Sequence, residues 1–162
     1  MGGGAHLPYG LFLLAEAYGK TGQIEEGLTV LTEALAVVDK TGERWREAEP
    51  YRLKGELTLQ KFHVSGSKFQ VADSLESSVR RLESEAEECF WKAIEIARRQ
   101  QAKSLELRAV MSLSRLWQQQ GKREEARRML AEIYGWFTEG FDTKDLQEAE
   151  ALLKELSSPP SI

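Results

Sequence analysis

The sequence predicts an all-α protein in which helices pair into hairpins of similar design. Apolar residues recur three or four positions apart along most of the chain, which places them on one face of a helix. Only four prolines occur among 162 residues, so long helices can form without interruption. Two helical segments around a glycine occur near the start and again near the end, and this pattern predicts internal repetition.

The first predicted hairpin covers about residues 8–41, and a matching one covers about 104–137. The apolar positions of the first hairpin are Leu11, Leu14, Tyr18, Leu28, Leu31, Ala34 and Leu35. Gly22 lies between its two helices, and Gly121 has the same place in the later hairpin. Because glycine tolerates the left-handed conformation that ends a helix, both are expected to close the helix before them.

A middle hairpin is predicted at about residues 44–101. Equivalent positions in the first helices are Ala15, Gly55 and Ser114. Equivalent positions in the second helices are Ala34, Ala93 and Ile133. The spacing is 40 and then 59 residues in the first set, and 59 and then 40 in the second. The repeat period is therefore about 40 residues, and the middle hairpin carries a 19-residue insertion between its helices, at about 62–80.

The insertion itself predicts irregular surface structure, because loops tolerate growth. A small β-hairpin is the alternative, since Phe-x-Val alternation occurs on either side of Ser-Gly-Ser. Beyond it, apolar residues at three- and four-residue steps predict one unusually long helix from about Ser74 to Gln101.

A final helix is predicted at about 143–156, with Asp142 or Thr143 capping its first free amides. Its apolar face, expected to cover the third hairpin, comprises Leu146, Ala149, Leu152, Leu153 and Leu156. The segment 157–162, with two consecutive prolines, is expected to be a tail, and the glycine-rich segment 1–6 a linker or cloning remnant. The chain is thus expected to form a single domain over residues 7–156.

The composition favours some classes of function over others. The net charge of −4 argues against a domain that mainly coats nucleic acid, which usually needs a basic surplus. The strongest apolar run, residues 11–15, is stopped by Glu16, so no signal peptide, membrane span or membrane partner is expected. A single cysteine excludes an internal disulfide, and the cytoplasm is the expected location.

The residues suited to catalysis or metal binding are few and scattered. His6, His63 and Cys89 make up the supply of neutral-pH acid–base and soft-metal groups, and their spacing suggests no contact. Acidic pairs such as Glu124-Glu125 lie in first turns of helices, where the helix dipole explains them. The sequence therefore predicts no enzyme activity, no cofactor and no metal site.

Basic doublets and aromatic residues have structural explanations. The doublets at 80–81, 98–99, 122–123 and 127–128 are interleaved with glutamates, which favours a self-paired helix surface over a phosphate or acidic-peptide site. The aromatic residues expected to pack in the core or between hairpins are Trp117, Tyr134, Trp136, Phe137 and Phe141. An exposed Trp45 would instead mark contact with a partner.

These residues resemble the tetratricopeptide repeat family. In the first hairpin the characteristic positions are occupied by Leu14, Ala15, Tyr18, Gly22, Gly27, Leu31 and Ala34. In the third they are occupied by Leu113, Ser114, Trp117, Gly121, Ala126, Leu130 and Ile133. The resemblance implies a right-handed α-solenoid of about three hairpins plus a C-terminal capping helix. The segment 136–146 also resembles the C-terminal end of large bacterial signalling proteins that join a nucleotide-binding ATPase, sometimes with a cyclase domain, to such repeats.

The resemblance implies a non-catalytic protein–protein interaction module of a bacterial signalling or regulatory protein. A peptide or neighbouring domain would bind in a concave groove lined by the first helices. Carried over to this sequence, the groove residues are Tyr9, Phe12, Glu16, Lys20, Glu49, Arg52, Glu56, Gln60, Arg108, Met111, Arg115, Gln118 and Gln119, with Gly19 and Leu59 beside them. The alternative is a structural self-association module that mediates homodimerisation of a larger ATPase- or cyclase-type regulator.

Overall fold

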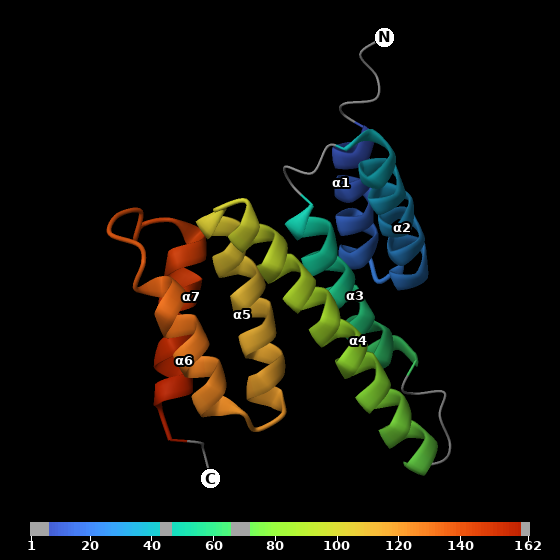
Figure 1. Cartoon of the computed structure of the whole chain (residues 1–162). Helices are drawn as coiled ribbons and strands as arrows, with labels where there is room; N and C mark the ends of the chain where they lie inside the picture. The colour runs from blue at the N-terminus through green and yellow to red at the C-terminus, as the bar shows by residue number, and fades with distance from the viewer. Residues whose placement is uncertain (1–6, 43–46, 66–71, 160–162) are drawn as a thin grey trace. The chain divides into compact units, whose positions relative to one another are not determined.

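The structure is a computed structural model that describes residues 7–42, 47–65 and 72–159. In this part of the chain every regular element is an α-helix and no strand occurs, as predicted (Figure 1). The chain divides into two compact units, the first ending at Ala93 and the second beginning at Ile94. The predicted linker at 1–6 lies outside the described residues. Trp45, whose exposure would mark contact with a partner, lies outside them too.

In the first unit, α1 (Leu7–Lys20) and α2 (Ile24–Thr41) form an antiparallel hairpin (Figure 1). Gly22 connects them in the left-handed conformation, with φ of 80°. The next amide, of Gln23, donates a hydrogen bond to the carbonyl of Tyr18 at 2.9 Å and so closes the end of α1. The prediction for this glycine is confirmed, because a residue with a side chain would be strained there.

Helix α3 (Ala48–Ser65) packs mainly on α2 and less extensively on α1. The buried residues of this core cluster are Ala15, Ile24, Leu31, Leu53 and Leu57. Leu57 lies between two glycines: a Cβ atom on Gly19 would come within 2.7 Å of Leu57 Cδ2, and one on Gly27 within 3.0 Å of Cδ1. The absence of side chains at these two positions lets α3 approach the hairpin closely.

The second helix of the middle hairpin is α4 (Ala72–Arg99), which confirms the prediction of one long helix. Phe90 of α4 lies directly against the backbone of Gly55 on α3. The insertion differs from its prediction: residues 62–65 continue α3 and residues 72–80 already belong to α4, whereas 66–71 lie outside the described residues. The physical reason for the difference is helix extension, since each end of the insertion lengthens a helix that already packs on its neighbours.

The second unit contains the end of α4 together with α5 (Lys103–Gln119), α6 (Arg123–Tyr134) and α7 (Lys144–Ser157). Helices α5 and α6 form a hairpin around Gly121, whose φ of 83° matches that of Gly22, as predicted. Helix α7 packs on both of them (Figure 1). Its buried residues are Leu146, Ala149, Leu152 and Leu156. The hydroxyl of Thr143 accepts a hydrogen bond from the amide of Leu146, so the predicted cap is confirmed.

Two aromatic side chains that were expected in the core are exposed. Trp136 and Phe141 belong to the connection between α6 and α7, not to a helix face, and this explains the wrong prediction. Trp136 meets Phe137 edge to face at 5.2 Å between ring centroids. Phe141 packs against Tyr134 at 5.9 Å.

None of the described helices is both long enough and apolar enough to cross a lipid bilayer.

Candidate functional site

The predicted groove residues come from both units, and each unit is described by itself. In α1 the ring of Tyr9 stacks on that of Phe12 at 6.4 Å, and Glu16 pairs with Lys20 at 3.4 Å. Phe12 is half-buried against the core cluster, and Gly19 faces Leu57. Phe12 and Gly19 therefore contribute to packing between helices, which the prediction of outward positions did not anticipate.

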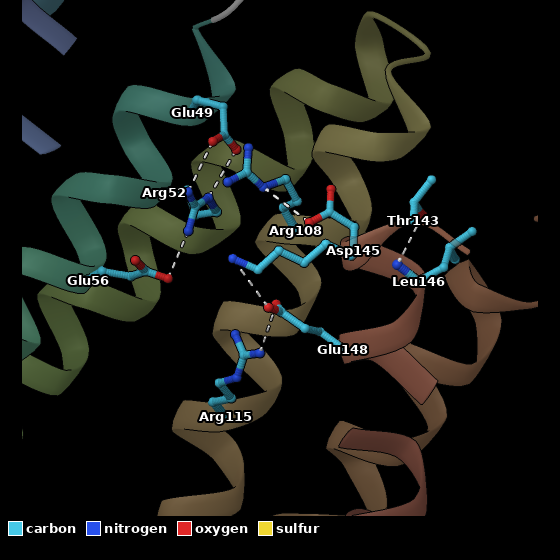
Figure 2. A network of polar contacts seen from close by, with 10 residues as sticks. Glu49, Arg52, Glu56, Arg108, Arg115, Thr143, Asp145, Leu146 and Glu148 are labelled. Atoms are coloured by element: carbon cyan, nitrogen blue, oxygen red, sulfur yellow. Dashed lines mark hydrogen bonds and ion pairs between the residues drawn. The ribbon is translucent and has the colours of Figure 1, made fainter. Parts of the chain in front are cut away.

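Arg52 of α3 is the centre of a compact ionic network (Figure 2). Its guanidinium donates to both carboxylate oxygens of Glu49 at 3.0 Å and to Glu56 Oε1 at 2.8 Å. The three residues lie three and four positions apart, so helical geometry brings them together on one face of α3. The side chains of Arg52 and Glu49 are only 12% and 8% exposed.

The electrostatics of Arg52 hold this network together. Burial alone would lower the pKa of Arg52, but the hydrogen bonds to Glu49 and the charges of Glu56 and Glu49 outweigh it and raise the pKa. A buried charge with paired carboxylates is costly to separate from them. Arg52 was predicted to hold a ligand, whereas its donors are engaged within α3. At the end of this face Gln60 is exposed and Leu59 is half-buried.

In the second unit, the two predicted arginines of α5 form looser pairs with α7 (Figure 2). Arg108 Nε lies 3.7 Å from Asp145 Oδ1, and Arg115 Nη2 lies 3.8 Å from Glu148 Oε2. Lys144 approaches the other oxygen of Glu148 at 3.7 Å. These distances exceed hydrogen-bonding range, and the arginine and carboxylate side chains are about two-fifths exposed or more. Such pairs are weak and exchange readily with other anions.

Sequence reasoning missed the partners of these arginines. Asp145 and Glu148 directly precede Leu146 and Ala149, the first two residues of the buried stripe of α7. The signal in the sequence was the position of these two acids at the edge of the apolar face that is predicted to cover the third hairpin. Carboxylates there are expected to reach basic residues on the helix that the stripe covers.

Met111 was predicted as an apolar anchor on the outward face of α5, and this prediction is wrong. Its side chain is only 2% exposed, so no ligand reaches it without disturbing the packing. Gln118 is half-buried and Gln119 is exposed near the end of α5. Of the predicted groove residues on this helix, those that remain accessible are therefore Arg108, Arg115, Gln118 and Gln119.

In three of the four basic doublets an arginine pairs with a nearby acid, as predicted for a self-paired helix surface, whereas Arg123 of the fourth binds backbone carbonyls. Glu124 accepts hydrogen bonds from Arg127 at 2.7 Å and from Arg128 at 3.2 Å. The bond from Arg127, aided by the positive charges, lowers the pKa of Glu124 to about 2, although the group is exposed. Arg98 likewise pairs with the buried Glu106 at 3.2 Å, and Arg80 pairs with Glu76.

Among the described residues, those considered for catalysis do not come together in one site. Burial raises the pKa of Cys89, and the positive charge of Lys54 offsets this only in part, so the reactive thiolate is disfavoured. The side chains of His6 and His63 lie outside the described part of the chain. Within that part, no group of three or more His, Cys, Asp or Glu side chains is arranged to hold a metal ion.

Comparison with known proteins gives no family for this chain: a scan against protein-family models finds no match, and a search of curated proteins finds none.

Proposed function

We propose that this chain is a non-catalytic protein–protein interaction module built from tetratricopeptide-like hairpins, and that the accessible face of α5 receives an acidic peptide. The observation that carries the proposal is the loose pairing of Arg108 and Arg115 with carboxylates of α7. The two guanidinium groups lie on one face of α5 and are about two-fifths exposed, and their ion pairs with α7 are of a kind that another carboxylate can replace.

The spacing of the two arginines defines the ligand. They are seven residues apart on α5, which is two helical turns or about 11 Å along the axis. A peptide in the polyproline II conformation repeats every three residues, about 9 Å, with the same side facing the protein. A ligand with two acidic residues three positions apart therefore matches both arginines. Gln119, beyond Arg115, can bind the peptide backbone.

Asp145 and Glu148 are themselves two acidic residues three positions apart. They occupy the arginines in the absence of a partner, so a ligand has to compete with them. Because each exposed ion pair is worth at most about 1 kcal/mol, this competition reduces the affinity for a partner without preventing binding.

The wider setting follows from the resemblance of segment 136–146 to bacterial signalling proteins. It supports the proposal that the module acts in the cytoplasm as part of a signalling or regulatory protein. A neighbouring domain or a separate protein would supply the acidic segment. A role in nucleic-acid binding, membrane association or cofactor chemistry is not part of this proposal.

Fluorescence anisotropy with a labelled peptide that carries two glutamates separated by two prolines tests the site. We expect Arg115→Ala to weaken binding, and Glu148→Gln to strengthen it by up to about fivefold, because the competing carboxylate is removed. Arg128→Ala is the matched control, since Arg128 is exposed and pairs with Glu124 on α6. Equal affinities of the two alanine variants, or no binding by the unaltered chain, would contradict the proposal.

A second candidate function, self-association, is favoured by a different observation. Leu13 and Leu14 of α1 are both exposed, although they belong to a predominantly apolar helix.

A further inference from the structure

Helix α1 has an exposed stripe without charge. Its members are Gly10, Leu13, Leu14 and Ala17. The leucines are 46% and 44% exposed, which is unusual for two adjacent large apolar side chains on one helix. A Cβ atom added to Gly10 would meet no other atom within 4 Å, so the helix backbone is open to close approach there.

The equivalent positions on α5 are all buried, and so are those on α3 except Lys54, the equivalent of Leu14, which is half-buried. Leu13 corresponds to Leu53, and Ala17 corresponds to Leu57, in the 40-residue spacing. Both α3 residues lie in the core cluster, where α3 packs against the α1–α2 hairpin. On α5 the equivalents of the four stripe residues are Ala109, Ser112, Leu113 and Leu116, all of them buried. The stripe of α1 is therefore the face with which α3 packs on another helix, and on α1 it is uncovered.

Among the described residues, a second copy of the chain has one helix with an exposed apolar face that can pack on this stripe, and that helix is α1. Of the other exposed large apolar side chains, Tyr9 belongs to α1 itself, and Trp136 and Phe141 lie in the connection between α6 and α7. The face of α2 that would bind such a helix is already covered by α3. The exposed residues of α7 are largely charged, for example Lys144, Glu150 and Lys154. Among the described helices, the uncharged face of α1 is thus best matched by the same face of a second copy.

The order of residues in the stripe is also symmetric. Read in either direction it is a small residue, two intervening residues, two leucines, two intervening residues and a small residue. We propose that two copies of this chain pair through α1, antiparallel, with a two-fold axis between Leu13 and Leu14. In this arrangement Leu13 faces the partner's Leu14, and Gly10 faces the partner's Ala17, as an isologous interface requires.

The interface predicts a weak dimer. The stripe extends over about two turns of helix, and stable complexes usually bury about 800 Å² on each partner. No charge has to be desolvated along the stripe, and antiparallel helices align their dipoles favourably. We therefore expect monomer and dimer to exchange, with the balance set by protein concentration.

Sedimentation velocity over two orders of magnitude in loading concentration tests the pairing. The unaltered chain should shift from monomer to dimer, and Leu13→Glu should raise the dimer dissociation constant about tenfold or more by placing a charge at the axis. Ala36→Glu is the control, because Ala36 is exposed on α2 of the same hairpin. A monomer at every concentration, or equal weakening by both variants, would overturn the proposal.

Cross-linking gives a second test that does not depend on an added charge. In a Cys89→Ser background, Leu14→Cys should form a disulfide-linked dimer under mild oxidation, because the two cysteines lie beside the axis. Ala36→Cys should remain monomeric under the same conditions. Equal rates for the two variants would show random collision and overturn the two-fold arrangement. The peptide experiment examines α5 in the second unit, so either proposal can fail while the other stands.

Discussion

At the scale of single residues, the contact between Gly55 and Phe90 fixes how closely α3 and α4 approach each other. A Cβ atom on Gly55 would lie 2.5 Å from Phe90 Cε1 and 2.8 Å from Cδ1, well inside van der Waals distance. Phe90 is completely buried, so its ring has little space to move. The missing side chain at residue 55 is therefore a packing requirement and not a conformational one.

We expect Gly55→Ala to lower the free energy of unfolding by about 1–2 kcal/mol, as judged by chemical denaturation. Overpacking costs about 1–3 kcal/mol, and the higher helix propensity of alanine returns up to about 1 kcal/mol. Combining it with Phe90→Leu should give a smaller loss than the sum of the two single changes, because leucine makes room for the new methyl group. Strict additivity would show that the contact is not the cause.

Arg52 shows at the same scale why a residue type alone does not define a site. An arginine on a predicted outward position was interpreted as a ligand-binding residue, but its guanidinium is bound by Glu49 and Glu56 of its own helix. The sequence did contain this signal, since acids three residues before and four residues after an arginine are the spacing of helical ion pairs. Whether such an arginine is accessible to a ligand depends on its burial, and burial depends on what packs over the helix.

At the scale of helices, Arg123 links the start of α6 to the end of α7. Its Nη2 donates to the carbonyl of Glu155 at 2.6 Å and to that of Ser158 at 2.7 Å. Carbonyls at the end of a helix have no amide partner within it, and a positive charge there also complements the helix dipole. One side chain thus completes the C-terminal end of the helix that covers α5 and α6.

Arg123→Ala should therefore loosen the last turn of α7 and lower the free energy of unfolding by about 1 kcal/mol. Hydrogen exchange is the sensitive measurement: protection should fall for the final amides of α7 while amides of the α5–α6 hairpin keep theirs. Arg128→Ala, which removes an exposed arginine that pairs within α6, serves as comparison. Uniform loss of protection across the second unit would contradict a local capping role.

The positions of the helices could largely be predicted from sequence, because periodicity, glycine and capping residues act locally. Gly22, Gly121 and Thr143 each mark a helix boundary that the structure confirms. Which face of a helix is covered could not be predicted, since it depends on neighbours. Leu14, one of the apolar positions of the first hairpin, is exposed, whereas its equivalent Leu113 is buried.

At the scale of the whole molecule, burial follows the same spacing in the three hairpins. In the second helices, Leu31, Phe90 and Leu130 are equivalent and completely buried. The N-terminal part of α4 is different: residues 75–85 include no buried side chain, and Ala86 is the first buried residue in the part of the helix whose side chains are described. Residues 75–80, the part of the insertion whose side chains are described, therefore contribute little to the cores from which stability derives.

This difference allows the 40-residue spacing itself to be tested. Removal of residues 62–80 would leave Lys61, Arg81 and Leu82 in the places that Thr21, Gly22 and Gln23 have between α1 and α2. The middle position requires the left-handed conformation, as Gly22 shows with its φ of 80°. The shortened chain should thus carry Arg81→Gly in addition to the deletion.

We expect this shortened chain to unfold cooperatively, at a thermal midpoint within about 5 °C of the full chain, because its hairpin cores are complete. The same deletion with Arg81 kept is the matched control, and it should be less stable by about 1–2 kcal/mol, the cost of a left-handed conformation for a residue with a side chain. Circular dichroism and calorimetry measure both. A chain that loses cooperative unfolding with either residue at position 81 would contradict the spacing, since correctly aligned hairpins need only the turn that glycine provides.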